Sequence, residues 1–142
     1  MLNINYVKGD DTVVEPKKST IGSAGYDLVS SETVILKIFE TKQISTGLYL
    51  EIPKGCFGQI YNRSSMAMKG LILTNSVGII DSDYRGEIKC IFTNITSEEI
   101  IINKGNKIAQ LIITPEIPCN FIEKNKLTET KRGTGGFGST GI

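Results

Sequence analysis

The charged turn from Gly78 to Gly86 contains the acidic residues best suited to catalysis. It begins with the apolar residues Ile79 and Ile80, continues with Asp81 and Asp83, and ends with Tyr84 and Arg85 before Gly86. The chain has no histidine, so imidazole acid–base chemistry is excluded and any general base must be a carboxylate. One aspartate could therefore deprotonate a water molecule in a cleft. The alternative is a plain hairpin, in which both aspartates accept backbone amides and Arg85 pairs with one of them.

A second segment, Tyr61 to Ser65, joins a predicted strand end to a predicted helix start. Arg63 supplies a guanidinium group, and Ser64 and Ser65 supply hydroxyls next to free backbone amides. Such groups bind anions, phosphate in particular. Ordinary capping of a short helix by one of the two serines also explains these residues.

The last residues, 131–142, differ in composition from the rest, because they contain five glycines and few side chains that can pack. The glycine spacing from Gly133 to Gly138 imitates both the dinucleotide fingerprint and the phosphate loop. Both motifs need a helix behind the glycines, and only four residues follow Gly138. The segment is therefore either a mobile tail or a lid over a nucleotide, with Arg132 and Phe137 available for phosphate and base.

The elements that must position these groups are mostly short strands. Apolar and polar residues alternate at Leu2, Ile4 and Tyr6, at Leu48, Leu50 and Ile52, and at Ile88, Cys90 and Phe92. Turn residues predict reversals at 8–10, 53–55, 103–106 and 114–115. Only residues 63–69 look helical, with Gly70 ending the helix. Segments 24–28 and 105–112 fit core strands with one polar residue facing outward. The pattern predicts an all-β sandwich, barrel or jelly roll.

Length and composition narrow the function further. At 142 residues the chain suits one domain, and a net charge of +1 argues against nucleic acid as a direct partner. Cys56, Cys90 and Cys119 are too widely spaced for a zinc knuckle or redox pair, and we expect inert, buried thiols in a reducing compartment. There is no signal pattern and no apolar run that could span a membrane, so we expect no membrane contact and a cytoplasmic or otherwise soluble intracellular protein.

Taken together and in order, five segments resemble the five-motif signature of the trimeric dUTPase family: 24–28, 63–65, 78–86, 105–112 and 132–141. The resemblance covers nearly the whole chain. It implies a distorted jelly-roll or β-barrel-like all-β fold with one short helix, formed by residues 1–130, and a flexible glycine-rich arm, 131–142, that closes the active site. It also implies a homotrimer whose active sites combine motifs of different subunits.

The same resemblance implies hydrolysis of dUTP to dUMP and pyrophosphate, which limits uracil in DNA and supplies dUMP for thymidylate synthesis. Asp81 is implied to orient and deprotonate the attacking water. Mg²⁺ is the implied cofactor, with Asp27 bonding one of its water ligands. The implied substrate contacts are Arg63, Ser64, Gln110, Arg132, Ser139 and Thr140 on phosphates, Asn75 with Gly78 and Ile80 on uracil, Tyr84 on the sugar, Phe137 on the base face, and also Ser65 and Gly138.

The chain departs from the family pattern near the second and fourth motifs. Asn62 stands where proline is usual, and Ser65-Met66 replace a usual Gly-Leu pair, which alters the surroundings of Ser64. Lys107 replaces a common arginine, a change expected to weaken a contact between subunits.

Two other functions remain open alternatives. dCTP deaminase shares the fold but hydrates a cytosine ring with a different acidic residue, and the Asp81–Tyr84 turn and aromatic arm favour dUTP hydrolysis over it. The other is a binding or regulatory module, such as a dUTPase-like protein of a virus or phage, whose arm closure on a nucleotide signals to a protein partner.

Overall fold

The computed structural model describes residues 2–139, which contain ten strands and one short helix. In chain order these are β1 (Asn5–Lys8), β2 (Tyr26–Val29), β3 (Val34–Leu36), β4 (Thr41–Glu51), β5 (Cys56–Asn62), α1 (Ser64–Met68), β6 (Leu71–Leu73), β7 (Gly78–Ile80), β8 (Glu87–Asn94), β9 (Ile100–Ile102) and β10 (Lys107–Pro115).

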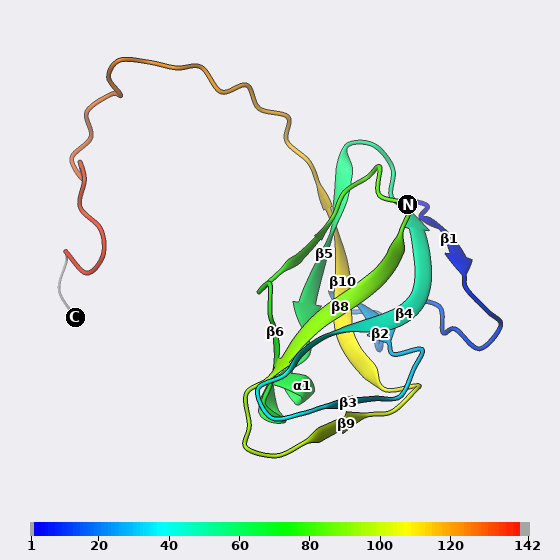
Figure 1. The fold of residues 1–142 in the computed structure, drawn as a ribbon. Helices are drawn as coiled ribbons and strands as arrows, with labels where there is room; N and C mark the ends of the chain where they lie inside the picture. The colour runs from blue at the N-terminus through cyan, green and yellow to red at the C-terminus, as the bar shows by residue number, and fades with distance from the viewer. Residues whose placement is uncertain (1, 140–142) are drawn as a thin grey trace.

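Two four-stranded antiparallel sheets and a two-stranded ribbon form the body of the molecule (Figure 1). The first sheet has the order β1-β4-β8-β6, the second has the order β2-β10-β5-β7, and β3 pairs with β9. The predicted all-β, jelly-roll-like fold is confirmed. Both four-stranded sheets keep open edges, so the strands do not close into a barrel.

The core lies between the two larger sheets, and side-chain alternation determines which residues enter it. Ile44, Leu48 and Leu50 of β4 are buried between more exposed neighbours, and Phe92 of β8 is fully buried, as the alternating patterns predict. The second sheet contributes Ile60 and other apolar residues to the same cluster. Each such side chain stabilises the fold by about 1.5–3 kcal/mol, so the sheets form a rigid support for the polar loops.

Two details of the predicted strands are wrong. The alternation from Leu2 to Tyr6 predicts a half-buried strand, whereas β1 starts at Asn5 and all four of its residues are exposed, because it is a sheet edge. The predicted turn at 114–115 does not form, since β10 continues to Pro115. Proline is tolerated there because the ladder ends at that residue and its missing N–H interrupts nothing beyond it.

The predicted helix is present as α1, but its serines do not cap it. Arg63 occupies the N-cap position without a side-chain capping hydrogen bond, and Ser64 and Ser65 are exposed. Gly70 ends the turn with φ of 79°, a value that favours glycine. No helix within residues 2–139 is long and apolar enough to cross a membrane.

The prediction that all three cysteines are buried is wrong. Cys90 is buried, and its burial raises the pKa of the thiol to about 12, so that it stays protonated. Cys56 is half-buried and Cys119 is exposed, because Cys119 follows β10 on a segment that leaves the core. All three thiols are free.

Beyond Pro115 the chain departs from both sheets. Residues 116–139 form no helix or strand, are exposed along almost their whole length, and extend away from the body (Figure 1). Ile117, Phe121 and Leu127 are all more than 80% exposed there. The boundary predicted between residues 130 and 131 stays a prediction.

Asn94, at the end of β8, is a buried polar hub that ties the β3–β4 connection to the β8–β9 connection. Its amide nitrogen donates to the carbonyls of Leu36, Lys37 and Glu98, and its oxygen accepts bonds from the backbone and hydroxyl of Thr96. Since the residue has no exposed surface, water cannot replace these five hydrogen bonds when they are lost.

We expect Asn94→Ala to lower the free energy of unfolding by about 2–4 kcal/mol, because buried carbonyls lose their donors. Urea denaturation at a fixed protein concentration measures the loss. Asn103→Ala, at an exposed loop position, is the control and should change stability by less than about 0.5 kcal/mol. Equal effects of the two substitutions would contradict the role of Asn94 as a hub.

Candidate active site

A compact polar cluster surrounds Asp27, and we call its members Ser19, Asp27, Arg63, Lys107 and Gln110 the Asp27 cluster. The Asp27 side chain is only 12% exposed. Its Oδ2 lies 2.6 Å from Lys107 Nζ and accepts a 2.7 Å hydrogen bond from Ser19 Oγ. Its Oδ1 lies 3.4 Å from Arg63 Nε. Gln110 Nε2 donates to the carbonyl of Asn62, just before Arg63.

Sheet pairing assembles this cluster from distant parts of the sequence. β10 lies between β2 and β5, so that Gln110 faces Asp27 on one side and Tyr61 on the other. Arg63 directly follows β5 and donates through Nη1 to the Lys107 carbonyl at 3.2 Å. Gly25 is required beside Gln110, because a Cβ there would lie 2.8 Å from Gln110 Oε1. The first, second and fourth motifs therefore meet at one place.

The Asp27 carboxyl is ionised at neutral pH. Burial alone raises its pKa, but the hydrogen bonds from Lys107 and Ser19 and the charges of Arg63 and Lys107 outweigh that effect and hold the pKa below the ordinary value of 3.8. The cluster thus presents cationic and amide donors around one fixed anion, an arrangement suited to binding phosphates.

The second group of predicted site residues lies on the turn after β7. Asp81 borders a pocket together with Ile52, Lys54, Cys56, Phe57, Ile79, Ser82, Asp83, Arg85 and Glu116. Arg85 donates to the carbonyls of Ser82 and Tyr84 and pairs with Glu51, so it braces the turn instead of neutralising an aspartate. Within residues 2–139 the Asp81 carboxylate accepts no hydrogen bond and pairs with no cation, which leaves it available to a ligand.

The remaining residues of this group flank β7. Gly78 is buried, and a Cβ there would lie 3.2 Å from Ile60 Cβ and 3.5 Å from Asn75 Nδ2, so a larger residue would crowd the strand. Asn75 is exposed before β7. Tyr84 donates to the Glu87 carbonyl at 3.0 Å, which fixes its ring over Gly86.

The structure does not bring the two groups together within one chain. Ile80 pairs with Gly58 near the start of β5, whereas Arg63 follows its end. Arg63 lies five positions beyond Gly58 along the extended chain, a span of about 16 Å. Asp81 lies one residue beyond Ile80, farther from the Asp27 cluster.

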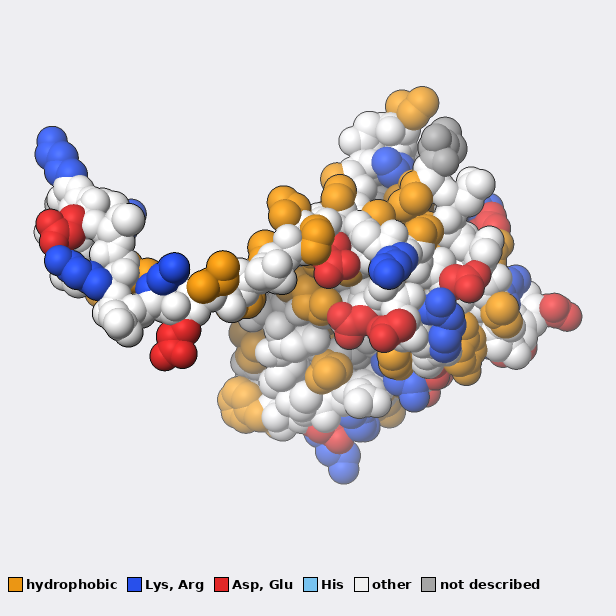
Figure 2. Space-filling view, turned by 90° about the horizontal axis from the view of Figure 1, so that it is seen from above, with side chains coloured by type: hydrophobic (Ala, Val, Ile, Leu, Met, Phe, Trp, Pro, Cys, Tyr) orange, Lys and Arg blue, Asp and Glu red, His pale blue; other side chains and the backbone are white. Residues whose placement is uncertain are grey.

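The described part of the arm, residues 131–139, is remote from both groups. Figure 2 shows the segment that carries it, residues 116–139, projecting from the body with both basic and acidic side chains along it. Arg132 Nε donates to the Gly135 carbonyl, and Phe137 is fully exposed. Gly138 and Ser139 are also exposed, and Thr140 lies outside the described residues.

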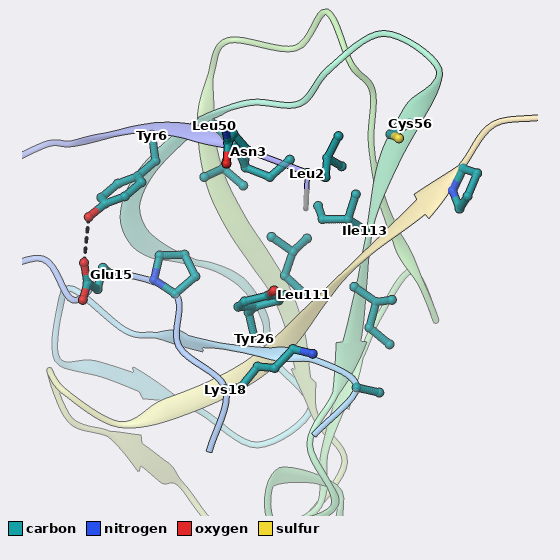
Figure 3. A pocket seen from close by; sticks show the side chains of 15 residues that line it. Leu2, Asn3, Tyr6, Glu15, Lys18, Tyr26, Leu50, Cys56, Leu111 and Ile113 are labelled. Carbon is teal, nitrogen blue, oxygen red and sulfur yellow. Dashed lines mark hydrogen bonds between the residues drawn. The ribbon is translucent and has the colours of Figure 1, made fainter. Parts of the chain in front are cut away.

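A separate apolar groove of about 570 Å³ opens between β1, β2 and β10 (Figure 3). Leu2, Leu50, Leu111 and Ile113 contribute to its lining, and at its rim the Tyr6 hydroxyl donates to Glu15 at 2.7 Å. The groove contains none of the predicted site residues, so this apolar hollow and the predicted chemistry lie apart.

Two cluster members were not among the predicted site residues. Ser19 belongs to an irregular segment with no motif, and nothing local indicates its bond to Asp27. Lys107 is predicted only as a subunit contact, whereas the structure places its ammonium on Asp27. Among residues 2–139, no three acidic or cysteine side chains gather where they could hold a metal ion by themselves.

The lowered pKa of Asp27 gives a pH-dependent contribution to stability. Because the pKa of the Asp27 carboxyl is lower in the folded than in the unfolded protein, its ionised form stabilises the fold when the pH is above the pKa of the unfolded state. This contribution is lost as the pH falls through the pKa of the folded state. At pH 7, without nucleotide, Asp27→Asn should lower the thermal midpoint by roughly 2–4 °C, the shift that about 1 kcal/mol causes in a chain of this size. The difference should shrink below about pH 4. Asp11→Asn, at an exposed position, is the control, and a constant difference down to pH 3 would contradict the assignment.

Comparison with known proteins identifies the family to which this chain belongs. A family model described as dUTPase matches residues 11–141. Deoxyuridine 5'-triphosphate nucleotidohydrolases of Rickettsia canadensis and Clostridium acetobutylicum are 48% and 40% identical, over 89% and 100% of this chain and 88% and 99% of theirs. The dUTPase of Staphylococcus bacteriophage 80alpha, solved with dUpNHpp, superimposes with a TM-score of 0.92 at 25% identity and covers both chains completely. A phage phi11 dUTPase whose structure describes a structural Mg(II) ion has a TM-score of 0.83 at 23% identity, over 90% of this chain and 100% of that one. The chain belongs to the dUTPase family.

Proposed function

We propose that this protein hydrolyses dUTP to dUMP and pyrophosphate at a site that combines the Asp27 cluster with the Asp81 turn of another copy. The observation that carries the proposal is the convergence of a fixed carboxylate, a guanidinium group and an amide at the Asp27 cluster. Family membership supports the reaction and the substrate. The product dUMP serves thymidylate synthesis, and removal of dUTP limits uracil in DNA.

The Asp27 cluster is the phosphate end of the proposed site. Arg63 presents a planar donor set that suits phosphate oxygens, and its Nη1 is already oriented by the Lys107 carbonyl. Ser64 and Ser65 are exposed beside it at the start of α1, and the absence of a side-chain cap leaves their hydroxyls for the substrate. Gln110 adds an amide on the same side of β10.

The residues of the cluster fit a magnesium ion that is held mostly by substrate phosphates. Mg²⁺ in such sites takes one or two carboxylates and keeps several waters. Asp27 is the one carboxylate of the cluster, and among the described residues its Oδ1 accepts no hydrogen bond and lies 3.4 Å from Arg63 Nε, so it can accept a hydrogen bond from a metal-bound water. When bound, the ion supplies charge neutralisation on the phosphates and the leaving pyrophosphate.

Asp81 is the proposed general base. It is exposed beside a pocket and lacks a described partner, so it can take a proton from water while holding that water in line with the α-phosphorus. The P–O bond to pyrophosphate then breaks as the new bond from water forms. Placing the water accounts for most of its contribution, because an ordinary aspartate is a weak base.

The segment from Asn75 to Tyr84, which follows β6 and contains β7, is the proposed base-recognition element. Asn75 and the backbone of Gly78 and Ile80 read the O4 acceptor and the N3–H donor of uracil, a pattern that cytosine reverses. Unpaired buried groups would reject cytosine by about 10⁴ or more. Tyr84, held by Glu87, lies against the sugar and excludes a ribose 2′-hydroxyl.

The separation of the two groups along β5 supports a homotrimer with shared sites. One chain alone keeps Asp81 too far from Arg63 to act on a phosphate that Arg63 holds. In a closed cyclic assembly, each copy supplies its Asp81 turn to the Asp27 cluster of a neighbouring copy, so every site is complete. The exposed arm then closes over the substrate, with Arg132 and Ser139 on phosphate and Phe137 on uracil. Thr140 joins the same phosphate contacts.

The proposed compartment is the cytoplasm. Free thiols at Cys56, Cys90 and Cys119 are stable in a reducing compartment, where nucleotide substrates also occur. The balanced charge suits a small nucleotide better than a nucleic acid.

Pyrophosphate release from dUTP with Mg²⁺ tests the proposal. Asp81→Asn should lower kcat by about 10²–10⁴-fold, because a general base contributes that much. Asp83→Asn, on the same turn, is the matched comparison and should lose less than about tenfold. An inactive wild type, or an Asp81→Asn variant as active as wild type, would overturn the mechanism. Substantial ammonia release from dCTP would favour dCTP deamination instead.

Removal of residues 131–142 separates the arm from the body. The thermal midpoint should stay within about 2 °C, because the described part of this segment contacts none of the core. Turnover of dUTP should fall by about 100-fold or more as water enters the open site. Unchanged turnover in the truncated protein would mean that the arm is only a tail.

A further inference from the structure

Asp27 also contacts two side chains, Lys107 and Ser19, that the proposed function does not place on phosphate. Its Oδ2 is held twice, by Lys107 Nζ at 2.6 Å and Ser19 Oγ at 2.7 Å, and Lys107 Nζ also donates to Ser19 Oγ at 3.2 Å. These three contacts form a closed triangle of Asp27 Oδ2, Lys107 Nζ and Ser19 Oγ. Within residues 2–139, the other oxygen, Oδ1, has only the longer polar contact to Arg63. The carboxylate is therefore fixed in rotation, with one oxygen occupied and one open.

A break in the β10–β2 pairing brings Lys107 to this triangle. Gln110 lies opposite Asp27, but Lys107 takes the place opposite Val29 that regular pairing gives to Ile108. Residues opposite each other share a face of the sheet, so regular pairing would turn Lys107 to the other face. The irregularity is a β-bulge, which re-aims a side chain in this way. It puts Lys107 on the face of Asp27 and Gln110.

Ser19 is delivered by a loop that is folded through its own hydrogen bonds. The backbone of Asp27 donates to the Lys17 carbonyl at 2.8 Å, which lays the loop along the start of β2. Thr20 and Ser23 close the turn that follows, since the Thr20 amide donates to Ser23 Oγ and the Ser23 amide to the Thr20 carbonyl. The Ser19 hydroxyl therefore reaches Oδ2 from a defined position.

Lys107 connects the carboxylate to the guanidinium in two separable ways. Its ammonium holds Asp27, whereas its backbone carbonyl accepts the bond from Arg63 Nη1. Substitution of the side chain removes the first contact and keeps the second. The two functions of the cluster, metal-bound water at Asp27 and phosphate at Arg63, can therefore be tested apart.

We infer that Ser19 and Lys107 are positioning residues that orient the Asp27 carboxylate, so that Oδ1 accepts the metal-bound water of a Mg²⁺–nucleotide complex. The inference rests on the proposed function, because it assigns a role toward the substrate complex of the same site. Partners that orient a carboxylate near a metal change metal affinity by about 10–100-fold when they are removed. The inference gives these side chains contacts to Asp27 and none to phosphate or base, so metal-free nucleotide binding should change little.

The variants form matched pairs. Lys107→Met and Ser19→Ala remove the contacts to Oδ2, whereas Lys107→Arg and Ser19→Thr keep a donor at each position. Lys104→Met and Ser97→Ala, both on exposed loops, are the controls. Mn²⁺ affinity is measured by electron paramagnetic resonance of the free ion in the presence of dUpNHpp. Affinity for dUpNHpp in EDTA and the Mg²⁺ concentration for half-maximal turnover of dUTP are measured in parallel.

We expect Lys107→Met to weaken Mn²⁺ binding about 10-fold and Ser19→Ala about 3-fold, with parallel increases in the Mg²⁺ requirement. The conservative and control variants should stay within about twofold of wild type, and dUpNHpp affinity in EDTA should also stay within about twofold for all variants. The inference would be overturned if Lys107→Met and Ser19→Ala bound Mn²⁺ as tightly as the control variants while the wild type hydrolyses dUTP. Equal losses of metal-free dUpNHpp affinity would do so too, since they indicate a general structural role. A wild type that leaves dUTP intact would instead refute the proposed function.

Discussion

The fixed length of β5 is the constraint on which the proposed site depends. This strand pairs with β10 on one side and β7 on the other. Pairing with β10 brings the Asp27 cluster to its end, and pairing with β7 brings Asp81 to its start. A paired strand inside a sheet cannot shorten, so the Asp27 cluster and Asp81 stay apart in each chain. The proposed function therefore needs a second copy of the chain to complete each site.

The Asp27 cluster is held together by ion pairs and hydrogen bonds between its own side chains. Asp27 is largely buried and ionised, a costly state for an unpaired carboxylate, and the donors from Lys107, Ser19 and Arg63 offset that cost. The same donors fix its direction. Preorganisation of this kind spares the substrate complex the entropy of ordering the carboxylate. The exposed Asp81 turn has fewer such contacts, and Arg85 braces its backbone instead.

Sequence patterns predicted the elements well where the physics is local. Alternation found β4 and β8, because a half-buried strand has period two, and Gly70 ended α1, because glycine accepts a positive φ. The patterns failed where contacts are distant. Nothing near Ser19 indicates its bond to Asp27, and a bulge in β10 reverses the face of Lys107 that regular alternation assigns. Sheet pairing, which no motif indicates, brings the first, second and fourth motifs together at the Asp27 cluster and keeps the third apart from it.

Complementation between two inactive variants tests the shared site most directly. Arg63→Ala disables the phosphate end and Asp81→Asn disables the base, so each homogeneous protein should be nearly inactive. Co-refolding equal amounts should restore dUTP hydrolysis at about a quarter of the sites, those that take Arg63 and Asp81 from different subunits with both intact. A mixture as inactive as its two parents would contradict a site built between copies and would place both residues in one chain's site.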